Sequence, residues 1–236
     1  MKIFSIENGQ AWYGSSLNHL GKVVTDFKEF SQRPETFDLV LFTGGEDVHP
    51  GIYGHRHYSG RGSSSMCQRD MKEAFVFQLA KRFGIPMAGI CRGLQFTAAM
   101  CGSTLVQDFG GHGWHNGTPI LAKYPDGKEA TIEGLCMHHQ MVNDDTLTPE
   151  MIVVGYVKGT GNTKKKYYLS DNGKHVPQGM EIEAIFCTRP LMFGVQYHPE
   201  SMPKDSSGYK FFCAWVDYMV QTKESWNKSN TKVLHA

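Results

Sequence analysis

The sequence predicts an α/β fold: a single domain with a mostly parallel central sheet flanked by helices, flavodoxin-like, and an antiparallel meander in its second half. Three apolar runs, residues 37–45, 85–90 and 191–197, have the length of buried strands. A helical pattern separates the first two runs, and the order strand–helix–strand favours parallel strands joined by crossover helices. From Thr118 onward, short strands separated by turn sequences such as residues 125–127 indicate the antiparallel part.

The remaining elements complete this fold. Residues 1–6 are predicted as the first strand, residues 92–100 as the helix that follows the strand at 85–90, and residues 207–220 as a closing helix. We expect the domain to span residues 1–222 and the polar tail 223–236 to fray.

Residues 69–83 have the clearest amphipathic pattern in the chain. Apolar side chains recur there every four residues, and Gly84 follows as a stop. These side chains are predicted to form the buried stripe of the helix: Met71, Phe75, Leu79 and Phe83.

Composition narrows the function classes. The chain of 236 residues carries 24 basic and 23 acidic residues, so its net charge of +1 implies no general attraction to nucleic acid or membrane. No apolar run approaches the roughly 20 residues of a membrane span, and the first residues lack a signal-peptide pattern. The six cysteines show no paired spacing, which favours free thiols and a cytoplasmic location.

Cys91 lies between the predicted strand 85–90 and the helix 92–100. Gly89 and Gly93 flank it at two residues on either side, so strand and helix can meet in a tight turn. This is the arrangement of a nucleophile elbow, in which the thiolate is stabilised at the N-terminus of a helix. Taken alone, the motif also fits a buried structural cysteine between two packing glycines.

A base for Cys91 is available near the other end of the chain. The strand 191–197 is followed at once by His198, and Glu200 lies two residues further on. A cysteine nucleophile needs a histidine to hold the thiolate and an acceptor to orient that histidine. Although the sequence at 198–200 also fits an ordinary strand-to-helix turn, the pairing with Cys91 favours a catalytic triad.

Two backbone donors could stabilise the oxyanion that forms when a thiolate attacks an amide carbonyl. One is the N–H of Arg92, directly after the nucleophile. The other is predicted in the turn at Gly44 and Gly45, because glycine allows the backbone to approach a ligand closely. By themselves, these glycines are also typical of a plain turn at the end of a strand.

The chain resembles the class I glutamine amidotransferase superfamily. The resemblance rests on Gly-Ile-Cys-Arg-Gly-Leu-Gln at 89–95 and Tyr-His-Pro-Glu at 197–200, and the matching order covers about residues 38–200. Within the superfamily the chain is most similar to the C26-like γ-glutamyl hydrolases, which include the γ-glutamyl-γ-aminobutyrate hydrolases. The markers of that branch are residues 44–50, 53–54, 69–70 and 138–140. The chain departs from the pattern before Asp38 and at residues 162–179.

The resemblance implies that the enzyme cleaves a γ-glutamyl amide through a γ-glutamyl thioester, without a cofactor. It also implies that the glutamyl end of the substrate is held by Gln95, His138, His139 and Gln140. For Gln95, the other interpretation is a polar helix residue that faces solvent.

The leaving group stays open at this point. Release of ammonia would make the protein a glutaminase subunit that feeds a synthetase partner, whereas release of a larger amine would make it a free-standing γ-glutamyl hydrolase. A third reading is a non-catalytic binding homologue. We favour the amidotransferase, because ammonia release is the commonest task in the superfamily.

Two further clusters are interpreted without new chemistry. Histidines 112, 115, 138 and 139 match no metal motif, so no metal site is predicted. The three lysines at 164–166, beside Tyr167 and Tyr168, are interpreted as a solvated strand edge rather than a nucleic-acid site.

Overall fold

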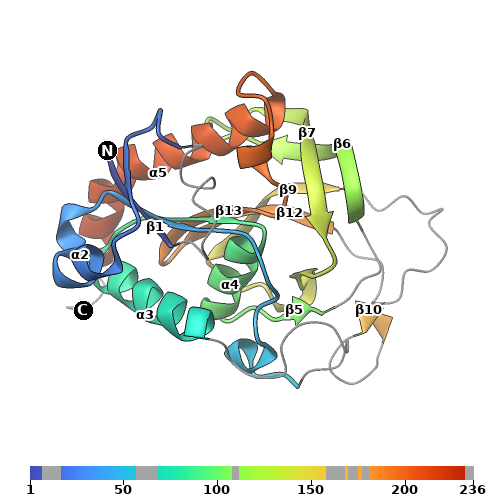
Figure 1. Cartoon of the computed structure of the whole chain (residues 1–236). Helices are drawn as coiled ribbons and strands as arrows, with labels where there is room; N and C mark the ends of the chain where they lie inside the picture. Colours follow the sequence, from blue (N-terminus) through green and yellow to red (C-terminus); the bar gives the residue numbers. More distant parts are fainter. Residues whose placement is uncertain are drawn as a thin grey trace.

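The fold is a large mixed sheet covered by helices on both faces (Figure 1). The computed structural model describes residues 1–6, 17–56, 68–107, 112–157, 168–169, 175–176 and 181–231. The segment at 162–179 therefore lies almost entirely outside the described residues, and so do the lysines at 164–166.

The central sheet has nine strands in the order β2-β1-β3-β4-β13-β12-β9-β6-β7. The first five pair in parallel: β2 (Lys22–Val24), β1 (Lys2–Ile6), β3 (Leu39–Phe42), β4 (Met87–Ile90) and β13 (Leu191–Val195). The others are antiparallel: β12 (Glu181–Thr188), β9 (Met151–Val157), β6 (His112–Lys123) and β7 (Glu129–His138). The predicted fold class is confirmed. The antiparallel part is not a simple meander, because β6 lies between β7 and β9.

In the described ranges, four short strands and four short 3-10 helices connect these elements. The strands form two small sheets: β5 (Leu105–Val106) with β8 (Met141–Val142), and β10 (Tyr168–Leu169) with β11 (His175–Val176). The 3-10 helices are η1 (Pro34–Thr36), η2 (Pro50–Tyr53), η3 (Asp144–Thr146) and η4 (Pro199–Ser201).

Alternation along the buried strands creates two hydrophobic cores, one on each face of the sheet. In β3, Val40 and Phe42 point to one core, while Leu39 and Leu41 point to the other. Helices α2 (Phe27–Gln32), α3 (Gln68–Phe83) and α4 (Arg92–Met100) pack on the first core, and α5 (Ser207–Thr231) covers the second (Figure 1). None of the helices in the described ranges has the length and apolar composition needed to cross a membrane.

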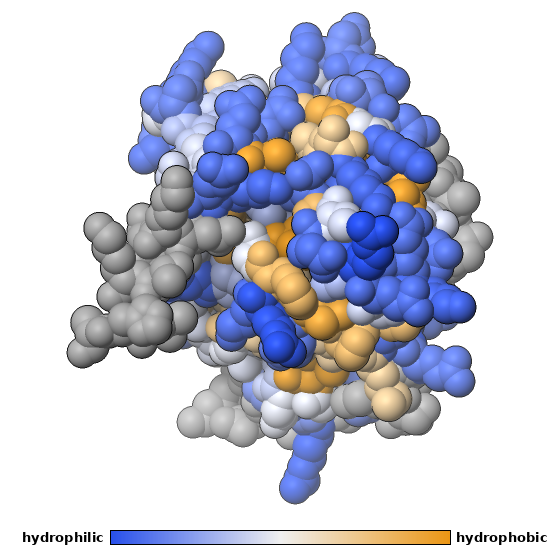
Figure 2. Space-filling view, turned by 90° about the vertical axis from the view of Figure 1, so that its left-hand side faces the viewer, coloured by the Kyte–Doolittle hydropathy of each residue, from blue (hydrophilic) through white to orange (hydrophobic). Residues whose placement is uncertain are grey.

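The predicted buried stripe of α3 is wrong. Met71, Phe75 and Phe83 are 63%, 48% and 42% exposed, and they lie on the outer side of the helix. The helix instead buries a face that contains two acidic residues: Asp70, Glu73, Val76, Phe77 and Ala80. The acidic side chains can be buried because the guanidinium groups of Arg69 and Arg92 pair with them. On the side of the molecule at the left of Figure 1, apolar surface lies among hydrophilic side chains (Figure 2).

The closing helix is longer than predicted. It continues past Val220 to Thr231, so the expectation of a frayed tail from residue 223 is wrong up to that point. The extension is stabilised by Trp226, whose ring lies 6.1 Å from that of Phe186, and by Lys223, whose Nζ lies 2.9 Å from Asp38 Oδ1. Residues 232–236 lie outside the described part of the chain.

Candidate active site

The candidate site lies at the carboxyl ends of three neighbouring parallel strands. β3 pairs with β4, and β4 pairs with β13. Cys91 directly follows β4, the Gly44–Gly45 turn follows β3, and His198 follows β13. In open α/β sheets this edge is where ligands bind, so the topology collects these distant segments at one place.

Cys91 adopts a strained backbone conformation, with φ at 52° and ψ at −109°. It is the only non-glycine residue with positive φ in the described ranges. Two backbone hydrogen bonds hold it: its N–H donates to Val195 O at 2.7 Å, and its carbonyl accepts from Gln95 N at 3.1 Å. Strain of this kind typically costs about 1–3 kcal/mol and is found at functional sites.

The flanking glycines are required by close packing. A Cβ added at Gly89 would lie 2.6 Å from the carbonyl carbon of Gly93, and one added at Gly93 would lie 2.1 Å from Phe42 O. The helix α4 is therefore pressed against the ends of β3 and β4. This agrees with the tight strand-to-helix turn that the sequence predicted.

His198 contacts both Cys91 and Glu200. Its Nδ1 lies 2.6 Å from Glu200 Oε1, and its backbone N–H donates to Leu135 O at 2.9 Å. Burial alone would lower the pKa of His198, but the charge and hydrogen bond of Cys91, together with Glu200, raise it to about 10. The structure thus brings the three predicted triad residues together.

The imidazole of His198 is therefore expected to stay protonated through pH 6–9, as an NMR titration of the ring nitrogens would show. In a Cys91→Ala variant its pKa should fall, because the contribution of the thiol is lost while burial remains. Because the folded-state pKa lies above the unfolded value near 6.5, this group contributes stability that is fully present below about pH 6.5. That contribution is lost as the pH rises through about 10. A wild-type ring that titrates near 6.5 would contradict the proximity of Cys91.

Gln196 is a further side chain in contact with Cys91, and the sequence motifs did not indicate it. Its Nε2 lies 3.6 Å from Cys91 Sγ and donates to the sulfur, while its Oε1 accepts from Gln95 Nε2 at 3.2 Å. A donor at this position stabilises a thiolate. The spacing in the sequence could have indicated this residue. Gln196 precedes His198 by two residues at the end of a strand, and residues two apart there lie on the same side of the sheet.

The predicted substrate-binding residues divide into two groups. Gln95 and His138 are buried and bind protein groups: Gln95 Nε2 donates to Gln140 O at 2.9 Å, and His138 Nδ1 lies 2.9 Å from the same oxygen. Gln95 does not face solvent. His139 is partly exposed and contacts Asp47 at 3.0 Å, whereas Gln140 Oε1 is buried and has no hydrogen-bond partner among the described residues.

A family comparison identifies the chain. The model of the peptidase C26 family matches residues 22–160, which is more than half of the sequence. The chain belongs to the peptidase C26 family. The resemblance to the class I glutamine amidotransferase superfamily is thereby confirmed, and related proteins and structures agree with it.

Relatives of this C26 protein carry glutamine-related names. It is 26% identical over 196 residues to a candidate glutamine amidotransferase of Schizosaccharomyces pombe, covering 78% of this chain and 70% of that protein. It is 29% identical over 142 residues to the glutamine-hydrolyzing GMP synthase of Chlamydia caviae, covering 60% of this chain but only 24% of the synthase. The fold resembles that of PurLQS from Thermotoga maritima, with a TM-score of 0.56, 16% identity and coverage of 94% and 97% of the two chains.

A second cysteine–histidine–glutamate cluster adjoins the Cys91 site, because its histidine, His138, shares the Gln140 carbonyl with Gln95. Cys136, His138 and Glu183 place a thiol, a ring nitrogen and a carboxylate within 4.8 Å of one another. The thiol donates to Glu183 Oε2 at 3.5 Å, and His138 Nε2 lies 3.4 Å from Glu183 Oε1. Burial raises the pKa of Cys136, which keeps the thiol protonated.

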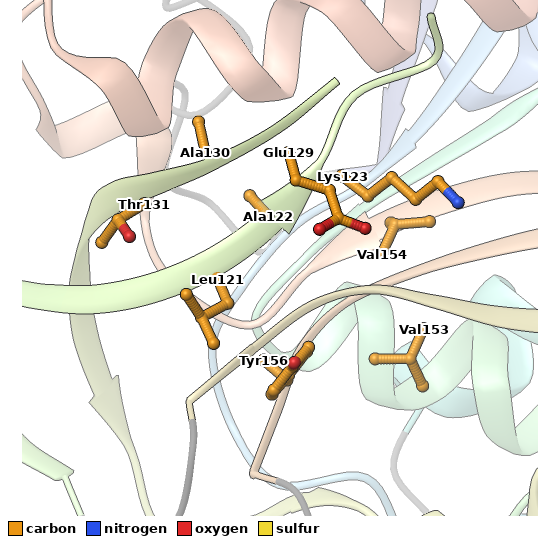
Figure 3. Close-up of a pocket in the computed structure, with 9 residues that line it drawn as sticks. All are labelled: Leu121, Ala122, Lys123, Glu129, Ala130, Thr131, Val153, Val154 and Tyr156. Carbon is orange, nitrogen blue, oxygen red and sulfur yellow. The ribbon is translucent and has the colours of Figure 1, made fainter. Parts of the chain in front are cut away.

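The C26 protein also has a pocket of ≈ 360 Å³ between β6, β7 and β9 (Figure 3), and Cys91 is not among the residues that line it. Leu121 and Tyr156, which are paired across β6 and β9, both line it. In the sheet, β13 and β12 lie between β9 and the strand that leads to Cys91. The pocket therefore takes no part in the candidate active site.

Proposed function

We propose that this C26 protein hydrolyses the γ-amide of glutamine, releasing glutamate and ammonia, with Cys91, His198 and Glu200 as the catalytic triad. The observation that carries the proposal is the contact of the strained Cys91 with His198, whose Nδ1 is bound at 2.6 Å by Glu200. A nucleophile held next to a base, with the base oriented by a third group, is the arrangement needed for covalent acyl transfer.

The thiolate of Cys91 attacks the γ-carbonyl carbon, and the oxyanion is stabilised by the N–H groups of Arg92 and the Gly44–Gly45 turn. His198 then donates its proton to the departing nitrogen, so that the C–N bond breaks and a γ-glutamyl thioester remains. A water molecule gives a proton to His198 and attacks the thioester. Glutamate leaves and the Cys91 thiolate returns, without any cofactor.

The glutamyl end of the substrate presents an ammonium and a carboxylate. We assign the ammonium to Gln140, because its buried Oε1 is an acceptor without a hydrogen-bond partner in the part of the chain that the structure describes. A buried acceptor of this kind typically costs about 1–3 kcal/mol until a donor arrives. His139, Gln95 and His138 support this wall, His139 through its contact with Asp47.

Ammonia needs an acceptor, and we propose a synthetase partner subunit that receives it. The name of the glutamine-hydrolyzing GMP synthase of Chlamydia caviae supports this assignment. A thiol enzyme of this type requires reduced cysteines, in agreement with free thiols at 91, 101, 136, 187 and 213 and with a cytoplasmic location. We propose no binding to nucleic acid or membrane.

A second candidate is a free-standing γ-glutamyl hydrolase that releases a larger amine, such as a polyamine or γ-aminobutyrate. The match to a peptidase family favours it, since peptidases release amines larger than ammonia. The triad and the thioester are the same in both candidates, and only the leaving group differs.

The test is to incubate the purified chain with glutamine, γ-glutamylputrescine and γ-glutamyl-γ-aminobutyrate, and to quantify glutamate and the released amine. Asparagine, one methylene shorter, and the Cys91→Ala variant are the controls. We expect Cys91-dependent glutamate release from glutamine. A kcat/KM for a conjugate more than about tenfold above that for glutamine, or roughly 1.4 kcal/mol, would select the second candidate. If none of the substrates gives Cys91-dependent release of glutamate, the third hypothesis, a non-catalytic binding protein, would remain.

A further inference from the structure

Four charged side chains form a buried network between α3 and the candidate active site. Arg69 Nε lies 2.8 Å from Glu73 Oε1, and Arg92 Nη2 lies 2.6 Å from Asp70 Oδ1. Arg92 Nη1 also binds Glu73 Oε2. One carboxylate, that of Glu73, therefore bridges the two arginines, and all four side chains are at most 9% exposed.

The guanidinium of Arg69 also holds the turn that follows β3. Its Nη2 donates to Thr43 O at 2.9 Å, to Gly44 O at 2.9 Å and to Thr43 Oγ1 at 3.2 Å. The turn wraps closely around this side chain, because a Cβ at Gly45 would lie 2.4 Å from Arg69 Nη1. Gly45 has φ at +135°, a conformation that residues with a Cβ rarely adopt.

These contacts fix the direction of two peptide N–H groups. In a trans peptide the C=O and the following N–H point in opposite directions. Because Arg69 holds the carbonyls of Thr43 and Gly44, the N–H groups of Gly44 and Gly45 point away from it. Rotating either peptide would break a charge-assisted hydrogen bond, which is among the stronger kinds in proteins.

We propose that Arg69 is a positioning residue that holds the Gly44–Gly45 turn as one half of the oxyanion hole, an inference that rests on the proposed function. The other half, the N–H of Arg92, begins α4, and the side chain of Arg92 is bound to Glu73 and Asp70. Both halves are thus tied to the first turns of α3 through Glu73. Buried ion pairs contribute little net stability compared with apolar packing. Stability alone therefore does not explain the network, whereas positioning of the two N–H groups does.

The experiment compares Arg69→Met with Arg82→Met, a basic residue exposed near the end of the same helix. Arg69→Met leaves Glu73 bound to Arg92, so no carboxylate of the network loses its last partner. We expect kcat for glutamine hydrolysis to fall on the order of 10²-fold, as when an oxyanion donor is lost, while KM changes less than about threefold. Arg82→Met should match the wild type.

Alkylation of Cys91 by iodoacetamide is the discriminating readout, because it requires the thiolate but forms no oxyanion. Its rate should be unchanged in Arg69→Met. A parallel loss of alkylation and kcat would mean general damage to the site and would overturn the proposal, as would an unchanged kcat. Arg69→Lys should recover only part of the rate, since a single ammonium cannot reproduce the fork that holds Glu73 and both carbonyls.

Two further measurements test the proposal if Arg69→Met does not fold or if the protein does not hydrolyse glutamine. If Arg69→Met does not fold, Gly45→Ala replaces it, because its methyl group would displace Arg69 from the turn and should give the same selective loss of kcat. Retained kcat in Gly45→Ala would overturn the proposal. The amide ¹H–¹⁵N resonances of Gly44 and Gly45 should shift in Arg69→Met but not in Arg82→Met. If the wild type shows no turnover, this shift alone supports the proposal that Arg69 positions the turn. Resonances that do not shift in Arg69→Met would refute the proposal.

Discussion

Replacing Cys91 with alanine is expected to abolish glutamine hydrolysis, with a loss of about 10⁴-fold or more, because an alanine side chain cannot form the thioester. The fold should survive. The side chain becomes smaller, and the backbone hydrogen bonds of residue 91 to Val195 and Gln95 do not involve the sulfur. Steady-state kinetics and a thermal unfolding curve measured on the same preparation test both parts of the expectation.

Cys213→Ala is the matched control. Cys213 is the more accessible of the two thiols, but burial raises its pKa to about 11, so little thiolate is present at neutral pH. A glutamine-like electrophile should therefore label Cys91 far faster than Cys213, as peptide mass mapping would show. Equal labelling of the two thiols, or full activity in Cys91→Ala, would refute the proposed nucleophile.

The elbow and the strand ends were predictable because their rules are local. A short apolar run, a cysteine between glycines and a helical pattern are all contained within residues 85–100, and the structure has β4 and α4 there. The parallel order of the strands then fixes which ends meet. His198 could be matched with Cys91 from the sequence alone because each follows a strand of the same sheet.

The orientation of α3 was not predictable from its own sequence. The four-residue spacing of Met71, Phe75, Leu79 and Phe83 describes an apolar stripe, yet the helix turns most of it towards solvent. The deciding contact is with Arg92, which lies 19 residues after Glu73 and 22 residues after Asp70. Hydrophobic periodicity cannot register a buried ion pair with another element, and here that pair determines which face is buried.

The Gly44–Gly45 turn illustrates the same limit. The glycines at 44 and 45 indicated a close backbone approach, and the structure has Gly45 at φ +135°. Which way the peptide groups point depends on Arg69, which lies on another element. Local sequence therefore indicates where the backbone comes close, while tertiary contacts decide what it presents.

The second large effect is expected at His198. A His198→Asn variant removes the group that carries the proton between Cys91 and the leaving nitrogen in the proposed mechanism, so kcat should fall about as far as in Cys91→Ala. Glu200→Gln should be milder, by roughly 10²-fold, because an amide oxygen can still accept from Nδ1 and keep the ring oriented. In the proposed mechanism, Glu200 supplies orientation and charge, whereas His198 moves the proton.

The pH dependence separates these two roles. Glu200 contributes to the raised pKa of His198, so Glu200→Gln should lower this pKa and shift the alkaline limit of kcat/KM to lower pH. The shift is towards lower pH because the proposed mechanism requires a protonated His198 to expel the leaving nitrogen. If the pKa of His198 is lower, the ring loses this proton at a lower pH. The comparison is a kcat/KM profile between pH 6 and 10 for both proteins. An unshifted profile with an unchanged rate would show that another residue orients the imidazole.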